Sequence, residues 1–209
     1  GYNVAVHGQK TYNGVALLSR TPLEDVVRGL PGDETDDQAR YIEAVVSGPK
    51  PVRVASIYLP NGNPLGSEKF AYKLAWMERL HRHAADLLRL EEPLALMGDY
   101  NVIPGPLDAA NPGEWTGDAL FQPESRAALR ALLWLGLTDA WTEAGEGPGG
   151  YTFWDYQAGA WPRKNGIRID HALLSPQAAD RLAGCRIDRA PRGWDKPSDH
   201  TPLIIELAP

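Results

Sequence analysis

The sequence has 209 residues, only one cysteine, Cys185, and no long apolar run. A single thiol cannot form a disulfide within the chain, so a fold held by internal disulfides is excluded, and we interpret Cys185 as a small, semi-buried residue. The longest apolar stretches, such as residues 94–97 and 172–174, are far too short to cross a membrane. No basic segment followed by an apolar stretch opens the chain, as a signal peptide would. We therefore expect a cytoplasmic protein that does not bind membranes.

An excess of positive charge is also absent, because the formal net charge is −6. Proteins bind nucleic-acid phosphates mainly through lysine and arginine, so this charge balance argues mildly against a broad basic surface for DNA binding. A local basic strip would be enough, however. The last third of the chain supplies candidates: Arg163, Lys164, Arg168, Arg186, Arg189, Arg192 and Lys196. Composition alone favours an ordinary solvated surface for them.

The apolar pattern predicts short strands in adjacent pairs, with helices inserted between the pairs. The predicted strands are residues 2–7, 14–19, 40–46, 52–58, 94–100, 151–154, 167–174 and 202–207, and the predicted helices are 68–90, 125–135 and a short 175–182. Strands and helices do not alternate regularly, so we predict an α/β (α+β) fold of mixed sheets packed face to face, with helices outside. The length fits one domain, residues 1–209.

Polar side chains stand at the end of the apolar strand predicted for residues 94–100. Asp99 and Asn101 are two positions apart, so their side chains point to the same side, roughly 7 Å apart along an extended chain. Both could face one phosphate or one metal ion, because hard divalent cations prefer oxygen ligands. Asp and Asn are equally common as the first residues of a loop, so this motif alone leaves both interpretations open.

Three other segments also place polar groups at strand ends. Tyr58 ends a strand and Asn61 follows in a Pro/Gly loop, which by itself is ordinary turn chemistry. Asp170 shares a strand face with Arg168, and an ion pair between them is as good an explanation as a functional site. In a loop before the last strand, His200 follows an aspartate, and a histidine there can donate to a phosphoryl oxygen or move a proton near neutral pH.

In order and spacing, these segments together resemble the exonuclease III family of DNA-repair nucleases, within the endonuclease/exonuclease/phosphatase superfamily. The resemblance spans essentially the whole chain. The segments that carry it are Gly14-Val15-Ala16-Leu17-Leu18-Ser19, Tyr58-Leu59-Pro60-Asn61-Gly62, Gly98-Asp99-Tyr100-Asn101, Tyr151-Thr152-Phe153-Trp154-Asp155-Tyr156, Arg168-Ile169-Asp170 and Ser198-Asp199-His200. The Tyr-Thr-Phe-Trp and Arg-Ile-Asp segments favour the DNA-repair branch over lipid or inositol phosphatases.

The resemblance implies a four-layered fold, a two-sheet β-sandwich flanked by helices. It implies a metal-dependent DNA phosphodiesterase, an exodeoxyribonuclease III or abasic-site endonuclease of base excision repair. The expected substrate is double-stranded DNA with abasic sites or 3′ ends, the expected cofactor is Mg²⁺ or Mn²⁺, and the expected state is a monomer.

The resemblance also assigns roles. The expected catalytic residues are Tyr58, Asp99, Asn101, Asp170 and His200. Asp99 would activate water with Asn101 holding it, and His200, oriented by Asp170, would stabilise the charge that develops on the phosphate. The expected metal ligands are Asp99, Asn101, Asp199 and His200. The expected DNA contacts are Lys10, Tyr12, Asn13, Asn61, Phe153, Trp154, Ile167, Arg168 and Ile169, of which Phe153, Ile167 and Ile169 would line a pocket for a flipped-out abasic sugar.

One departure separates this sequence from the family pattern. Members open with a strand carrying a Trp-Asn-x-Asn-like motif and continue to a second strand that ends in Gln-Glu, whose glutamate is the main metal ligand. Neither motif occurs here, and the first glutamate is Glu24. We therefore expect an N-terminally truncated domain without the first strand and its covering helix, with weak metal binding, exposed apolar surface and impaired activity relative to a longer parent.

Two alternatives stay open at this point. One is a phosphatase of the same superfamily that acts on a non-DNA phosphate ester, which a basic pocket without a DNA groove would favour. The other is a catalytically impaired remnant that still binds DNA.

Overall fold

The computed structural model describes residues 1–208, built around a six-stranded mixed sheet. In spatial order the strands are β3 (Leu23–Arg28), β4 (Tyr41–Val46), β5 (Val52–Tyr58), β6 (Leu94–Asp99), β8 (Asp170–Leu174) and β7 (Thr138–Asp139). Only β5 and β6 run parallel, and every other pair is antiparallel. Parallel strands need a long crossover, which the helix α1 (Glu68–Leu88) supplies between β5 and β6.

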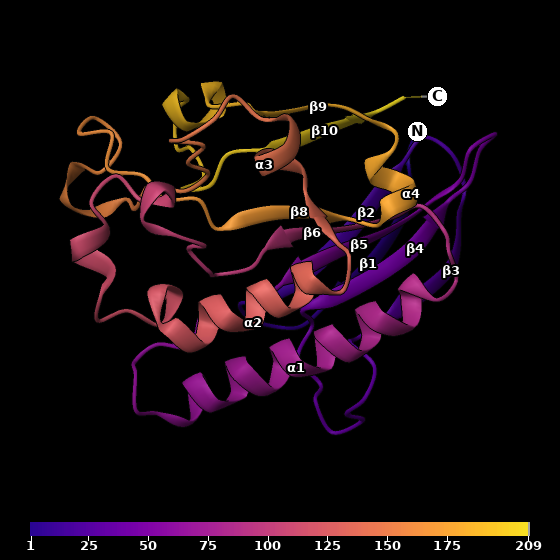
Figure 1. The fold of residues 1–209 in the computed structure, drawn as a ribbon, viewed down its shortest axis with the longest axis horizontal. Helices are drawn as coiled ribbons and strands as arrows, with labels where there is room; N and C mark the ends of the chain where they lie inside the picture. The colour runs from indigo at the N-terminus through magenta and orange to yellow at the C-terminus, as the bar shows by residue number, and fades with distance from the viewer. Residues whose placement is uncertain (209) are drawn as a thin grey trace.

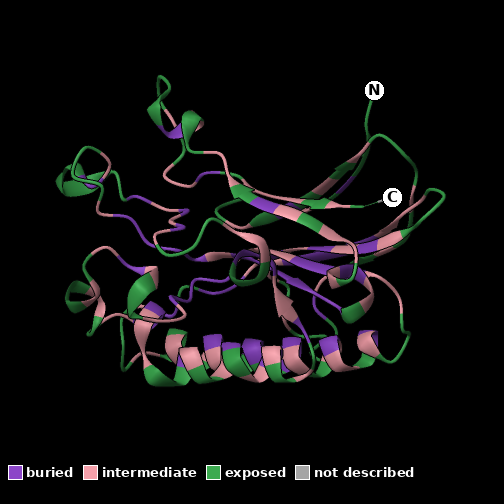
Figure 2. Cartoon of the chain, turned by 45° about the horizontal axis from the view of Figure 1, so that its top comes forward, coloured by how far each residue is buried: buried purple, intermediate pink, exposed green. Residues whose placement is uncertain are grey.

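Two helices, α1 and α2 (Pro123–Trp134), lie side by side under one face of this sheet (Figure 1). Along α1, Trp76, Met77 and Leu80 recur at helical spacing and are buried, so one side of the helix faces the sheet. Figure 2 shows this division, with buried residues on the side of α1 toward the sheet and exposed ones on the other. These side chains and others from the sheet, such as Leu96, form the largest core cluster.

The opposite face carries two small antiparallel sheets. One pairs β1 (Asn3–Gly8) with β2 (Gly14–Ser19), and the other pairs β9 (Leu182–Ile187) with β10 (Leu203–Leu207). The short helices are α3 (Ala140–Ala144) and α4 (Pro176–Ala179), and single 3₁₀ turns cover Pro106–Asp108, Pro112–Trp115, Ala119–Phe121, Gln157–Gly159 and Ala190–Gly193. The prediction of sheets packed face to face with helices outside is confirmed.

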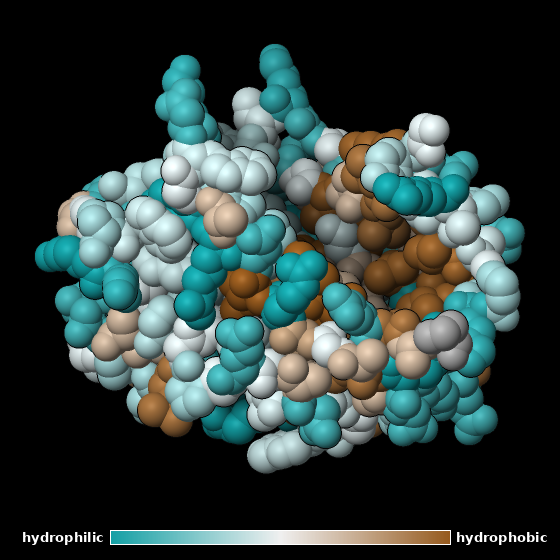
Figure 3. Space-filling model, turned by 90° about the horizontal axis from the view of Figure 1, so that it is seen from above, coloured by the Kyte–Doolittle hydropathy of each residue, from teal (hydrophilic) through white to brown (hydrophobic). Residues whose placement is uncertain are grey.

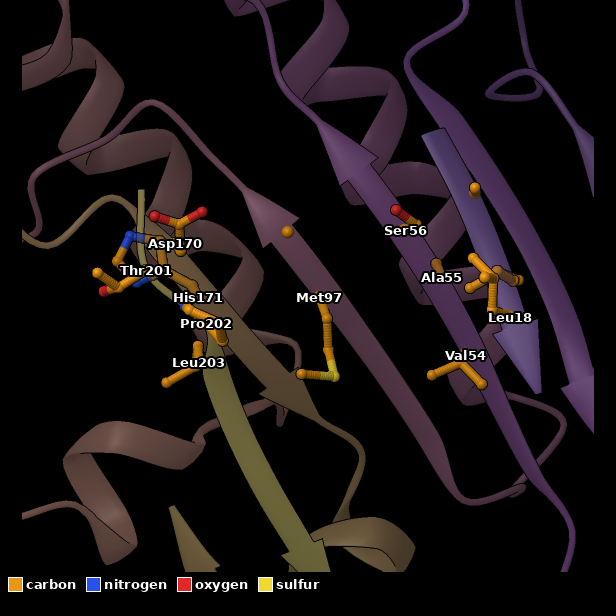
Figure 4. A pocket seen from close by; sticks show the side chains of 13 residues that line it. Leu18, Val54, Ala55, Ser56, Met97, Asp170, His171, Thr201, Pro202 and Leu203 are labelled. Carbon is orange, nitrogen blue, oxygen red and sulfur yellow. The ribbon is translucent and has the colours of Figure 1, made fainter. Parts of the chain in front are cut away.

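A groove of about 460 Å³ separates the two small sheets. Val54 and Met97 of the central sheet line it, between Leu18 on β2 and Leu203 on β10 (Figure 4). Figure 3, which looks down on this face, shows apolar side chains gathered in the hollow. Within residues 1–208, β2 pairs only with β1 and β10 only with β9. The groove therefore leaves apolar surface in contact with water, and the Leu18 residue is 62% exposed.

Several predicted elements differ from the observed ones. Residues 151–154 do not form a strand, because their only ladder pairing is two isolated bridges, from Phe153 to Ile167 and from Phe153 to His200. The strand predicted for 167–174 begins at Asp170. Strands β3, β7 and β9 were not predicted. The first, β3, has adjacent charged residues, Glu24 and Asp25, and ends in Arg28, which is typical of an edge strand and hides the period of two. Among the described residues, no helix is both long and apolar enough to cross a membrane.

Candidate active site

The register of three central strands brings polar side chains to one edge of the sheet. Tyr58, the last residue of β5, lies beside Asp99, the last residue of β6. Asp99 in turn lies directly opposite Asp170, the first residue of β8. Residues opposite each other in a ladder point to the same face with their Cβ atoms about 5 Å apart. Pairing alone therefore brings three of the predicted catalytic residues into one row.

His200 joins this row from the loop before β10. Its Nδ1 lies 2.8 Å from Oδ2 of Asp170, and its Nε2 lies 4.0 Å from Oδ2 of Asp99. The ring of Phe153 packs edge-on against the imidazole, with 5.0 Å between ring centroids. Thr152 fixes the start of β8, because its hydroxyl oxygen accepts hydrogen bonds from the backbone N–H of Asp170 and of the residue before it. The imidazole is thus held on two sides.

Two asparagines hold Asp99 from the other side. The backbone N–H of Asn101 donates to Oδ1 of Asp99 over 2.8 Å, and its side-chain amide donates to Oδ2 over 3.0 Å. The side-chain amide of Asn61 then donates to Oδ1 of Asn101 over 3.2 Å. The Asp99 carboxylate therefore accepts from Asn101 at both oxygens, and its position depends on the Asn61 and Asn101 loops.

The surroundings raise the pKa values of both the Asp99 carboxyl group and the His200 imidazole. Burial, and then the negative charge of Asp170, raise the pKa of Asp99 to about 7. Burial lowers the pKa of His200, but the hydrogen bond and charge of Asp170, with the charge of Asp99, outweigh it and raise that pKa to about 9. At neutral pH the site therefore combines a carboxylate close to its midpoint with a protonated imidazole.

A cleft of about 600 Å³ is lined by Tyr58, Asp99, Asp170 and His200, among others. Tyr12, at the tip of the loop between β1 and β2, is fully exposed and stands on its rim. Asp199 lines the cleft beside His200. Lys10 in the same loop is exposed, whereas the amide of Asn13 is hydrogen-bonded to Gln38. Among the predicted DNA contacts, Tyr12 and Lys10 are thus accessible to a substrate.

Other predicted DNA contacts lie inside the protein. Ile167 and Ile169 are buried in a cluster that Phe153 covers. Trp154 is buried too, and Arg168 is only 3% exposed. The guanidinium group of Arg168 lies 2.7 Å from a carboxylate oxygen of both Asp108 and Asp139, and no ion pair with Asp170 is formed. In this structure Arg168 and Trp154 therefore hold internal positions, and their contact with DNA stays a prediction.

The predicted metal ligands do not make a complete cation site. Within residues 1–208 no group of three or more His, Cys, Asp or Glu side chains is placed to hold a metal ion. Oδ1 of Asn101 accepts a hydrogen bond from Asn61, and Nδ1 of His200 is hydrogen-bonded to Asp170. Asp99 and Asp170 face each other and supply two carboxylates, and a Mg²⁺ ion held there would take its remaining ligands from water and the substrate phosphate.

The sequence analysis missed two basic residues at this site. Arg40 lies with its guanidinium carbon 5.0 Å from the ring centroid of Tyr58 and donates to the Tyr58 carbonyl oxygen. Lys73 is buried beneath the asparagines and donates to the carbonyl oxygens of Asn61 and Asn101. Lys73 carried a signal, because it interrupts the apolar stripe of α1 three residues before Trp76. Arg40 carried none.

The chain was compared with known proteins. Residues 1–200 match the Endonuclease/Exonuclease/phosphatase family. Exodeoxyribonuclease III of Haemophilus influenzae is 33% identical over 99% of this chain and 81% of that protein. The structure of the 3′–5′ exonuclease of Neisseria meningitidis superposes with a TM-score of 0.95 at 39% identity, covering 100% of this chain and 80% of that one. The structure of an AP endonuclease from Archaeoglobus fulgidus superposes with a TM-score of 0.92 at 36% identity, covering 99% of this chain and 79% of that one.

These matches cover nearly all of the chain at identities above 30%, and they place the strands that carry Tyr58, Asp99 and Asp170 within the matched part. The chain therefore belongs to the endonuclease/exonuclease/phosphatase family and, within it, to the branch of the exodeoxyribonuclease III proteins.

Proposed function

We propose that this chain forms the body of a DNA phosphodiesterase that acts in base excision repair on duplexes with abasic sites or 3′ ends. The observation that carries the proposal is the row of Tyr58, Asp99 and Asp170 along adjacent strands, with His200 bound to Asp170. The named activities of the relatives support the substrate class. One is an exodeoxyribonuclease III, another a DNA repair nuclease of Danio rerio, and a Neisseria 3′ phosphatase has been solved with a product DNA hairpin.

In this proposal Asp99 takes the proton from the attacking water. A base is most effective when its pKa lies near the working pH, and the pKa of Asp99 is raised to about 7. The water oxygen forms a bond to phosphorus as the bond to the leaving oxygen breaks. The charged imidazole of His200 donates to a phosphoryl oxygen, where negative charge increases during the reaction. Asn61 and Tyr58 flank the same position and contact the phosphate or the leaving oxygen.

A requirement for Mg²⁺ or Mn²⁺ belongs to the proposal as well. Asp99, Asp170 and Asp199 supply carboxylate oxygens around the cleft, the donor type that such ions prefer. Within residues 1–208 no three such side chains converge on one point, so we expect this chain alone to bind the metal ion weakly. When bound, the ion would neutralise charge on the phosphate.

The proposal is tested on a duplex oligonucleotide with one abasic-site analogue, with Mg²⁺ or with EDTA. We expect metal-dependent nicking next to the lesion, and we expect Asp99→Asn and His200→Ala to lower the cleavage rate by roughly 100-fold or more. Specific binding of the duplex without cleavage by the unaltered chain would support the DNA-binding remnant instead, and absence of both would contradict the proposal.

One feature favours the second candidate, a phosphatase of a non-DNA ester. A pocket of about 360 Å³ beside Asn61 is lined by Arg40 and Lys69 among others, which is the kind of basic pocket such an enzyme would use. Hydrolysis of a small phosphate monoester with no cleavage of DNA would favour it. Faster cleavage of the abasic duplex would exclude it as the main activity.

A further inference from the structure

The helix α1 turns a lysine into the interior directly beneath the cleft. Lys73 is 0% exposed, and its ammonium group donates to two backbone carbonyl oxygens, that of Asn61 over 3.0 Å and that of Asn101 over 2.5 Å. An ammonium group loses much hydration free energy on burial, and hydrogen bonds to neutral carbonyls recover only part of it. A lysine that served only to fill space would be better replaced by an apolar residue. Its position calls for another explanation.

The two carbonyl acceptors belong to the residues whose side chains hold Asp99. The Asn61 amide donates to the Asn101 side chain, and the Asn101 amide and backbone N–H donate to the Asp99 carboxylate. The amino group of Lys73 thus links the backbones of two segments, and the amides of those segments converge on the carboxylate. Lys73 itself lines none of the cleft.

The backbone segments that contact the Lys73 side chain adopt unusual conformations. Asn101 has φ +48°, in the left-handed region, which costs conformational free energy for a residue other than glycine and needs support from its surroundings. Gly62 has φ +90°, and a Cβ atom there would lie 2.7 Å from Cδ of Lys73. The loop after β5 therefore closes directly onto the lysine stem, and the hydrogen bond from Lys73 supports the strained peptide that follows β6.

We propose that Lys73 is a positioning residue for phosphodiester cleavage, which fixes the amides of Asn61 and Asn101 against Asp99 through their backbone carbonyls. The inference rests on the proposed function. Lys73 acts through its neighbours, so the catalytic rate constant depends on it more than substrate affinity does. A displacement of about 1 Å in a catalytic group can lower a rate roughly 100-fold.

The test compares Lys73→Met, which keeps the stem and removes the donors, with Lys73→Arg, which keeps charge and donors. The matched control is Arg79→Met, further along α1, where a buried guanidinium group binds Asp36 and the Leu30 carbonyl oxygen away from the cleft. On the abasic duplex we expect Lys73→Met to lower kcat roughly 100-fold with KM within about threefold. Lys73→Arg should restore most of the loss, and Arg79→Met should keep both constants while its melting temperature falls.

A second measurement needs no activity. Hydrogen exchange of the DNA-free protein should become faster in Lys73→Met at residues 59–63 and 99–103 and stay unchanged along β3 and β4. Unchanged exchange in those two segments, or a kcat within about threefold of the unaltered chain, would overturn the proposal. If the unaltered chain does not cleave DNA, the proposed function fails, and the exchange result still decides whether Lys73 holds the two loops.

Discussion

At the scale of single residues, the site contains two groups that bind their protons more tightly in the folded state. The Asp99 carboxyl has a pKa near 7 against an ordinary 3.8, so ionising it weakens the fold. That penalty is absent below pH 3.8 and is complete above about pH 7. His200 adds stability that is fully present below pH 6.5 and is lost as pH rises through about 9. Both groups therefore make the protein less stable as pH rises, Asp99 between about pH 3.8 and 7 and His200 between about pH 6.5 and 9.

The substitution Asp99→Asn should separate stability from activity. We expect it to abolish cleavage and yet to raise the free energy of unfolding at pH 8 in EDTA by about 1–2 kcal/mol, because the buried charge beside Asp170 is removed. At pH 3, where Asp99 is neutral in both states, the gain should vanish. Urea unfolding at the two pH values measures this, and a loss of stability at pH 8 would contradict it.

The Asp170→Asn substitution should lower the pKa of His200 from about 9 toward the ordinary 6.5, because the hydrogen bond and charge of Asp170 do most to raise it. Titration of the imidazole signals by NMR measures the change. Asp199→Asn is the matched control, since the charge of Asp199 raises the pKa of His200 less than Asp170 does, and its loss should shift the titration less. Equal shifts in the two variants would show that the hydrogen bond is not the cause.

At the scale of secondary structure elements, β5 and β6 meet so closely that one position admits no side chain. Gly98 has φ +143°, and a Cβ atom there would lie 2.0 Å from the carbonyl oxygen of Ile57. We expect Gly98→Ala to destabilise the fold by about 3 kcal/mol or more, through strain and displacement of the parallel pair. Gly184→Ala in β9, where nothing lies within 4 Å of the added carbon, should be close to neutral. Thermal unfolding measures the melting temperatures of both variants, and similar values would contradict the prediction.

The elements also show what the sequence could predict. The helix predicted for residues 68–90 is observed as Glu68–Leu88, because a long apolar stripe at helical spacing has few alternatives. The site residues Asp99, Asp170 and His200 were predicted from motifs at strand ends and do lie together. Strand β9 was missed since its apolar residues are interrupted by Gly184 and Arg186. The burial of Arg168 depends on Asp108 and Asp139, which are distant in the chain, so no local pattern could reveal it.

At the scale of the whole molecule, a groove between β2 and β10 opens the core of the protein to solvent. It exposes apolar side chains from both small sheets above the central one, and contiguous apolar surface of this kind promotes association or dye binding. The groove also shares Ser56, Gly98 and Asp170 with the catalytic cleft, so the two hollows are continuous.

We expect the native protein to bind a hydrophobic fluorescent dye and to associate weakly as its concentration rises. Leu18→Lys on the groove wall should lower both, whereas Leu107→Lys, on an exposed 3₁₀ turn outside the groove, should change neither. Dye fluorescence and sedimentation equilibrium provide the measurements. Equal effects of the two substitutions would show that the groove is not the surface responsible.

The β1–β2 hairpin packs on the central sheet through few groups. Its buried residues are Ala5 and Val15, which rest on Ile42, and side chains link its backbone to the sheet at only a few points, such as Arg28 to the Val6 carbonyl oxygen. A unit with so few anchors opens at a lower free energy than the whole protein unfolds. Opening would carry Tyr12 away from the rim of the cleft. Local unfolding of this hairpin would then also break the contact between Tyr12 and a bound substrate. A bound duplex would therefore protect the loop at residues 9–13 from proteases.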